Sequence, residues 1–391
     1  MDLIIFDKIQ QNECVQAILE RDNTKILKDI INFAETEGVT NNSIREYVSV
    51  LLANDDNIVS NLAQSGKKIG DELKKIAALD IDKIFKKLFS TQIKYSPSGN
   101  DTGFCRGYIS SIKELTESQN SQELLERLIE HYRTLGSGIL SKYIAFKYDG
   151  ELLGISKTDS ISFDSLVGLD YQKKILIDNT KAFISGKKAN NVLLFGDRGC
   201  GKSSSVKALL NMFCDDGLRI IEVPKAHIAD IPSLTAMLSE KPNKYILFLD
   251  DLSFESGDKD YKALKVAMEG QLQARGDNVV IYATSNRRHL IKETWEDRQG
   301  SDIHRNDHMQ ETLSLSERFG ISLVFSSPNQ KEYLNIVKEM LAAHGLEMNA
   351  DIEKAAVIWQ MDYGSKSGRC AKQFVLDYLS KDFKEKNNET K

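Results

Sequence analysis

The sequence reads Gly196-Asp197-Arg198-Gly199-Cys200-Gly201-Lys202-Ser203 just beyond its midpoint, and this stretch fits the pattern GxxxxGK[ST]. The run Asn191-Phe195 before it is mostly apolar, as in a buried strand. The residues after it carry apolar side chains at helical spacing: Val206, Leu209, Leu210 and Phe213. A strand before the motif and a helix after it are the context that a phosphate-binding loop requires. The stretch therefore predicts an α/β domain with a phosphate site.

The residue types of this loop suit a nucleotide. Glycines let the backbone bend and bring its N–H groups against phosphate oxygens, and the helix N-terminus adds partial positive charge. Lys202 is expected to reach the β- and γ-phosphates, and the Ser203 hydroxyl to ligate Mg²⁺. The expected nucleotide-binding residues of the loop are Gly196, Asp197, Arg198, Gly199, Cys200, Gly201, Lys202, Ser203 and Ser204. The alternative, a glycine-rich turn that binds nothing, is disfavoured.

Short apolar runs bounded by polar residues recur on both sides of the loop, which is typical of buried parallel strands. Five runs are expected to be strands: Val192-Phe195, Ile220-Val223, Tyr245-Leu249, Val279-Ala283 and Ile321-Phe325. Because helical stretches separate them, we predict a five-stranded parallel sheet with helices on both faces, over residues 156–328.

Two acidic residues follow the third of these strands. The run 245–249 delivers Asp250 and Asp251 to the carboxyl edge of the sheet, where such sheets bind their ligands. Asp250 is expected to complete the Mg²⁺ shell with Ser203. Asp251 is expected to orient or deprotonate a water molecule, the alternative being a capping acid for the next helix.

Helical patterns flank this core. Before it, residues 1–155 are expected to form a helical N-terminal domain with a partner-binding or regulatory role, its apolar stripes being core: Ile81, Ile84, Phe85, Leu88 and Phe89, then Leu124, Leu125, Leu128, Ile129 and Tyr132. After it, residues 329–391 are expected to form a small helical lid with a frayed tail. Its stripes are Tyr333, Leu334, Val337, Met340 and Leu341, then Phe374, Val375, Tyr378 and Leu379.

Composition narrows the class of protein. A chain of 391 residues exceeds the size of one core, so two or more domains are expected. The 52 Lys and Arg against 57 Asp and Glu leave a net charge of -5, which does not indicate a basic nucleic-acid-binding domain. The five cysteines are scattered and lack CxxC spacing, and the sequence lacks a run long enough to span a membrane. We therefore expect a cytoplasmic protein without membrane partners.

The motifs resemble those of the AAA+ ATPase superfamily. Phe163-Asp164-Ser165-Leu166-Val167-Gly168-Leu169 is similar to the segment that covers the adenine in those proteins. Within the superfamily, three further stretches resemble the bacterial predicted ATPases grouped as domain of unknown function 815, and this resemblance covers roughly residues 130–380. They are Leu252-Ser253-Phe254-Glu255, Tyr282-Ala283-Thr284-Ser285-Asn286-Arg287-Arg288-His289-Leu290 and Leu313-Ser314-Leu315-Ser316-Glu317-Arg318-Phe319-Gly320.

The resemblance implies further site residues. Val167 and Gly168 become candidate contacts of the base, and Asn286 occupies the sensor-1 position, where a polar side chain contacts the γ-phosphate or the water. Arg318 matches the arginine finger, which reaches the site of a neighbouring subunit. Arg369 resembles sensor 2 of the lid, with Lys366 and Lys372 as alternatives. The resemblance therefore implies ATP and Mg²⁺ as ligands and a homo-oligomer, a ring or a filament-like assembly.

Two departures from the superfamily affect the expected activity. Its usual Asp-Glu pair is Asp250-Asp251 here, and the shorter second acid is expected to slow hydrolysis. The segment Pro224-Lys225-Ala226-His227-Ile228-Ala229-Asp230 lacks the pattern of protein-threading loops, so no translocase is inferred.

Three weaker signals suggest a metal site, a reactive thiol and a nucleic-acid partner, and none of these is the favoured interpretation. Asp302, His304, Asp307 and His308 have polar surroundings, which favour a solvated loop over a metal site. Cys200 lies at a helix N-terminus, where a thiol pKa tends to fall, so oxidation that blocks nucleotide binding is a minor hypothesis. The basic run Arg287-Arg288-His289 leaves nucleic acid as a less favoured partner.

The function expected from the sequence is ATP hydrolysis at a subunit interface, coupled to conformational change on an unknown protein client. One alternative is a nucleotide-gated binding module or loader with slow or no turnover. Another, a small-molecule kinase, leaves Asn286 and Arg318 without a shared explanation.

Overall fold

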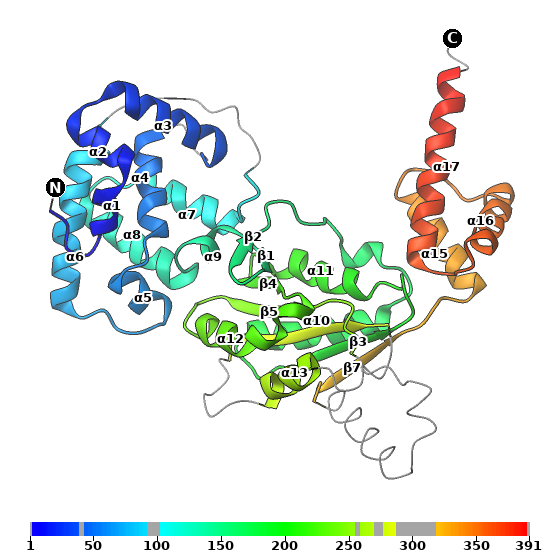
Figure 1. The fold of residues 1–391 in the computed structure, drawn as a ribbon. Helices are drawn as coiled ribbons and strands as arrows, with labels where there is room; N and C mark the ends of the chain where they lie inside the picture. Colours follow the sequence, from blue (N-terminus) through cyan, green and yellow to red (C-terminus); the bar gives the residue numbers. More distant parts are fainter. Residues whose placement is uncertain are drawn as a thin grey trace.

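The computed structural model describes residues 2–38, 43–91, 95, 102–254, 259–269, 277–286 and 318–388, with side chains up to residue 380. Figure 1 shows three consecutive parts: N-terminal helices, a central sheet covered by helices, and a group of C-terminal helices. The central and C-terminal parts carry the expected site, so the sheet is the frame on which that site is built.

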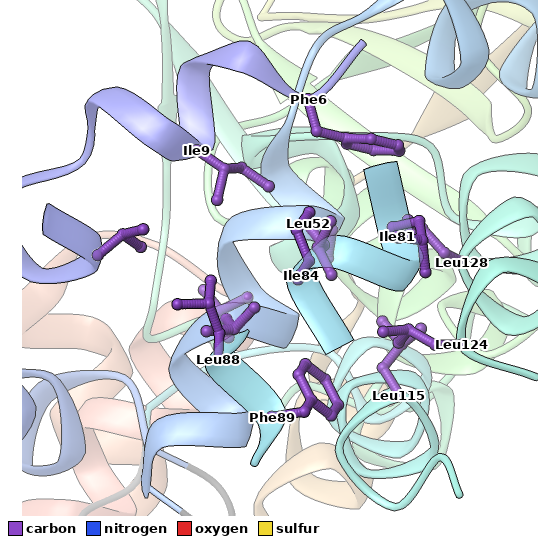
Figure 2. Packing of buried hydrophobic residues seen from close by; sticks show 14 of the residues in the cluster. Phe6, Ile9, Leu52, Ile81, Ile84, Leu88, Phe89, Leu115, Leu124 and Leu128 are labelled. Atoms are coloured by element: carbon purple, nitrogen blue, oxygen red, sulfur yellow. The ribbon is translucent and has the colours of Figure 1, made fainter. Parts of the chain in front are cut away.

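The N-terminal part is helical, as expected, and all of its helices except the last surround one core; Leu140 of that last helix packs into the core of the sheet instead. The helices are α1 (Asp7–Gln11), α2 (Glu13–Glu20), α3 (Asn23–Thr36), α4 (Ser43–Asn54), α5 (Ile58–Gln64), α6 (Asp71–Ile84), the π-helix η1 (Phe85–Phe89), α7 (Arg106–Thr116), α8 (Ser121–Thr134) and α9 (Ile139–Lys142). Figure 2 shows that side chains from distant segments meet in this core, among them Phe6, Leu52, Ile84, Leu115 and Leu128. The two apolar stripes of the sequence therefore pack inward, with Phe85 and Ile129 partly buried at the margin.

The five expected strands all form, in one sheet. They are β3 (Val192–Gly196), β4 (Leu218–Glu222), β5 (Lys244–Leu249), β6 (Val279–Ser285) and β7 (Ile321–Phe325). They pair in parallel in the order β4-β5-β6-β3-β7. The strand before the phosphate loop, β3, therefore lies between β6 and β7.

Two further strands extend the sheet beyond the five that the sequence predicts. β1 (Ala145–Tyr148) pairs in parallel with β4, and β2 (Leu152–Gly154) pairs with β1 as an antiparallel hairpin. Both fall within residues 1–155, which the sequence analysis assigns to the helical domain. Of the four β1 residues only Ala145 and Phe146 are buried, so this strand lacks the long apolar run that reveals the others.

Helices cover both faces of the sheet, as predicted. On one face α12 (Ile231–Ser239) and α13 (Lys259–Glu269) pack on Leu193, Leu247 and Ile281. On the other, α10 (Asp170–Ile184) and α11 (Lys202–Phe213) pack on Leu194, Ile246 and Val280. Successive strand residues point to opposite faces, which explains why the inner strands β3, β5 and β6 are buried along almost their whole length, whereas burial alternates along the edge strand β7.

The C-terminal part consists of α15 (Gln330–Ala342), α16 (Ala350–Tyr363) and α17 (Gly368–Asn388). Its core contains Tyr333, Val337, Leu341, Phe374 and Val375, all from the expected stripes. The described backbone of helix α17 extends to Asn388.

Among the described residues, no helix has the length and apolar character needed to cross a membrane.

Candidate functional site

The glycine-rich loop follows β3 and leads into α11 at the carboxyl edge of the sheet. At Gly196 φ is +130°, and a Cβ there would lie 2.1 Å from the Phe325 carbonyl oxygen. The next residue donates its backbone N–H to that same oxygen, at 2.8 Å from Asp197 N. A glycine is therefore required at 196, because the loop leaves the sheet in direct contact with the backbone of β7.

Helix α11 begins at Lys202 directly after this loop. Its N-cap, Gly201, has a φ of +93° and no side chain caps it, and the first turn contains no acid. The free N–H groups of such a helix start attract an anion. The N-terminus of α11 therefore fits a phosphate group.

The side chain of Lys202 is 7% exposed and folds back over the loop. Its Nζ donates to the carbonyl oxygens of Gly196 at 2.9 Å and Asp197 at 2.7 Å, and to Asn286 Oδ1 at 3.0 Å. Burial lowers the pKa of this ammonium, an effect that the nearby acids oppose. These neutral oxygens are weaker partners than a phosphate, so the ammonium is poised to exchange them for an anion.

Ser203 and Asp250 meet as the sequence predicts. The Ser203 hydroxyl donates to Asp250 Oδ1 at 2.7 Å. The same carboxylate oxygen accepts a second hydrogen bond, from the Thr284 hydroxyl at the end of β6. A hydroxyl and a carboxylate are oxygen ligands of the kind that Mg²⁺ takes together with substrate phosphates, so this pair fits the cation.

Asp251 and Asn286 also lie together. The Asn286 side-chain amide donates to Asp251 Oδ1 and accepts from Lys202 through its oxygen, so it bridges the acid and the ammonium. Asp251 has a φ of +51°, a left-handed conformation. Asp adopts this conformation more readily than a longer acid does, which gives a physical reason for Asp rather than Glu at this position.

The C-terminal helices contact the loop at two points. The N–H of Arg369, in the first turn of α17, donates to the Gly199 carbonyl oxygen at 3.2 Å. The carboxylate of Asp197 accepts from the Ser327 N–H at 2.8 Å, in the connection between β7 and α15, and hydrogen bonds from Ser327 lower its pKa. Of the alternatives to Arg369, Lys372 has its charge near Asp159. The loop is thus bonded to the C-terminal part at two places, the connection before α15 and the first turn of α17.

Cys200 is buried within the loop, and burial raises the pKa of its thiol, with hydrogen bonding from Ser327 as a smaller opposing effect. The lowered pKa expected at a helix N-terminus is therefore contradicted. Removal of the thiol from water disfavours its charged form and is the largest cause of this shift.

The expected base contacts lie beside the loop. Val167 packs against the apolar core of the C-terminal helices, whereas Gly168 has a φ of +78° and open space on its Cβ side. Two neighbours that the sequence analysis does not single out face the loop: a Cβ on Gly201 would lie 3.0 Å from Leu169 Cδ1 and 4.0 Å from Leu166 Cδ2. Residues 166–169 therefore form an apolar wall between the loop and the C-terminal helices.

Arg318 is separated from this group. It precedes β7, whose first residue Ile321 is paired with Val192, whereas the loop begins at Gly196, paired with Phe325. The strand between them has five residues, or about 17 Å at roughly 3.3 Å per residue. Arg318 therefore lies toward the opposite edge of the sheet from the loop of its own chain.

Some sequence signals fall outside the described residues: the cluster of Asp302, His304, Asp307 and His308, the basic run Arg287-Arg288-His289, and the stretch 313–317. Within the described residues, no group of three or more His, Cys, Asp or Glu side chains gathers as a metal site.

Thr284 and Ser327 are two further site residues that were not expected from the sequence. Thr284 stands two residues before Asn286 and is part of the quoted stretch 282–290. A hydroxyl residue so close to the end of a strand could have identified Thr284 as a candidate site residue. Ser327 carries no comparable signal, because its contact with Asp197 depends on the path of the chain after β7.

The sequence matches one family model, and the structure is similar to several solved structures. A family model described as "Protein of unknown function (DUF815)" matches residues 141–382. Among solved structures, the RuvB Holliday junction branch migration motor of Thermotoga maritima is 16% identical over 55% of this chain and 70% of that chain, with a TM-score of 0.35. Two substituted forms of that Thermotoga maritima protein give the same TM-score. One is 16% identical over 55% of this chain and 70% of that chain, and the other is 17% identical over 55% of this chain and 71% of that chain. No curated protein matches the sequence.

Proposed function

The chain belongs to the family described as "Protein of unknown function (DUF815)", and we propose that it is an AAA+ ATPase that binds ATP with Mg²⁺ at the loop 196–204 and hydrolyses it. One observation carries the proposal. Lys202, Asn286 and Asp251 form a continuous hydrogen-bonded series at the glycine-rich loop, next to the Ser203–Asp250 pair. These are the residue types that phosphoryl transfer to water requires: an ammonium and loop for the phosphates, oxygen ligands for a cation, and an acid for the water.

Each residue has a distinct proposed role. Lys202 and the N-terminus of α11 bind the β- and γ-phosphates, and Ser203 and Asp250 hold the cation. A bound Mg²⁺ supplies positive charge that offsets the charge of the phosphates. Asp251 orients the attacking water and accepts its proton, while Asn286 holds the Asp251 carboxylate in place.

Oligomerisation is part of the proposal. The position of Arg318, away from the loop of its own chain, supports a role at the loop of a neighbouring copy. Arg369 is proposed to approach the phosphates from the C-terminal helices, supported by its backbone contact with Gly199. We propose that the N-terminal helices contact the client, whose identity these residues do not specify.

A second candidate function is a nucleotide-gated binding module with slow turnover. Asp251 favours it, because its side chain is short and its carboxylate is engaged by Asn286. Single-turnover hydrolysis in a complex that holds nucleotide firmly would distinguish this module from a cycling ATPase.

The proposal is tested by equilibrium binding of a fluorescent ATP analogue to the wild type and to Lys202→Ala. The variant is expected to lose about 100-fold or more in affinity, because a charged phosphate contact is removed. Lys207→Ala is the matched control, since Lys207 lies further along α11 and pairs with Asp159 at the surface. Failure of the wild type to bind any nucleoside triphosphate would overturn the proposed function.

A further inference from the structure

Thr284 lies near the end of β6, and its side chain, 1% exposed, joins the two acids of the site. Its hydroxyl donates to Asp250 Oδ1 and accepts a hydrogen bond from the Asp251 N–H at 2.8 Å. One hydroxyl makes both bonds at once, because it has one proton and two lone pairs. A single buried oxygen therefore fixes the carboxylate of one acid and the backbone of the next.

The backbone of Thr284 extends this attachment. Its carbonyl oxygen accepts from the Leu252 N–H at 2.7 Å, so the amides of residues 251 and 252 both bond to Thr284. These bonds hold the chain where Asp251 is left-handed. A non-glycine residue persists in that conformation only where its surroundings determine it, and Thr284 supplies two of the restraining bonds.

We propose that Thr284 is a positioning residue for the nucleotide reaction, acting through Asp250 on the cation and through Asp251 on the water. This inference rests on the proposed function. The hydroxyl orients Asp250 Oδ1 toward Ser203 and fixes the direction in which Asp251 leaves the strand. Both acids depend on it, whereas the Lys202 contacts with the loop carbonyls are made without it.

Three variants separate the hydroxyl from the packing of the residue. Thr284→Val keeps the branched shape and removes the hydroxyl, whereas Thr284→Ser keeps the hydroxyl and removes the methyl group. Ser285→Ala is the matched control, because the neighbouring Ser285 is also buried and donates to the Leu252 carbonyl oxygen at 2.8 Å, which is a bond to the same segment but to neither acid.

The first measurement is hydrogen exchange of the Asp251 amide in the nucleotide-free protein. Thr284→Val is expected to exchange at least about tenfold faster than the wild type, since the amide loses its acceptor. Thr284→Ser and Ser285→Ala are expected to exchange at the wild-type rate. An unchanged amide in Thr284→Val would overturn the restraint on Asp251.

The second measurement uses the fluorescent ATP analogue and phosphate release. Without Mg²⁺, Thr284→Val is expected to bind the analogue as the wild type does. The Mg²⁺ concentration that gives half-maximal phosphate release is expected to rise about fivefold. We expect kcat to fall about tenfold with little change in KM. Thr284→Ser is expected to restore both. Wild-type magnesium dependence and kcat in Thr284→Val, or an equal loss in Ser285→Ala, would overturn the role. If the wild type binds no analogue, the proposed function fails, and the Asp251 amide still shows whether Thr284 fixes the acids.

Discussion

Lys202 and Asn286 are hydrogen-bonded, with the ammonium 3.0 Å from Asn286 Oδ1, although 84 positions separate them in the sequence. The other end of the same amide donates to Asp251. Asn286 therefore links the group proposed to bind phosphate to the group proposed to direct water, and a phosphate that draws Lys202 away would leave the amide bonded to the acid alone.

Replacing Asn286 with Ala is expected to separate binding from turnover. Lys202 keeps its two loop carbonyls, so affinity for the ATP analogue should change less than about threefold, whereas phosphate release should fall about 100-fold because Asp251 loses its restraint. Steady-state kinetics together with equilibrium binding check this. A loss of affinity with kcat unchanged would instead assign Asn286 to the binding of the nucleotide in its ground state.

Arg318→Ala tests action between subunits. The variant is expected to bind the analogue normally and to lose phosphate release by about 1,000-fold, as removal of an arginine finger does. Lys202→Ala is expected to bind nucleotide weakly but carries an intact Arg318. A mixture of the two variants should therefore release phosphate faster than either alone, because one copy supplies Arg318 to the loop of the other. A mixture that stays inactive, or full activity of Arg318→Ala, would refute the assignment.

Variants of Asp251 distinguish a cycling ATPase from a nucleotide-gated binding module. Asp251→Asn keeps the size of the side chain and removes the base, so nucleotide should stay bound while phosphate release falls about 100-fold. Asp251→Glu is expected to cost about 1 kcal/mol in unfolding free energy, because a longer acid fits the left-handed backbone less well. Urea unfolding and phosphate release measure the two effects. Phosphate release that Asp251→Asn leaves unchanged would remove Asp251 from the reaction.

The Asp251→Asn variant also serves to find the client. A pull-down with it, compared with one using Lys202→Ala, should retain proteins or nucleic acids that bind only the nucleotide-loaded form. Species retained equally by both variants do not depend on the nucleotide.

A pH-dependent loss of stability is expected from the N-terminal helices. His131 is 2% exposed, its Nδ1 lies 2.8 Å from the Ser111 hydroxyl oxygen, and burial lowers its pKa to about 4. Because the folded-state pKa lies below the unfolded value, the stabilisation is complete above about pH 6.5 and declines as the pH falls toward 4, by about 1.4 kcal/mol per pH unit at most. Urea unfolding of wild type and His131→Gln between pH 7 and pH 4 measures this. His131→Gln should show the shallower decline, and parallel curves would contradict the expectation.

The five expected strands were predictable because each contains a short apolar run, which is longest where the strand is buried on both faces, as in 245–249. The hairpin of β1 and β2 was not, since only two residues of β1 and none of β2 are buried. Of the site, Lys202, Ser203 and Asp250 follow from spacing and from strand ends. The contacts of Thr284 and Ser327 could not be predicted in this way, because a hydroxyl becomes informative only when its partner is known, and their partners lie 34 and 130 positions away.

The pairing of β1 with β4 has a mechanical consequence. The helices before residue 143 reach the sheet through a strand that is paired with β4 at Ala145, Phe146 and Lys147, and a side-chain bond from Asn243 to the Leu135 carbonyl oxygen at 2.9 Å reinforces the junction. Such a junction resists bending in a way that an unpaired linker does not. If the sheet rotates, the N-terminal helices would therefore move with it as one rigid unit. A molecule bound at their outer end would then move further than the sheet itself.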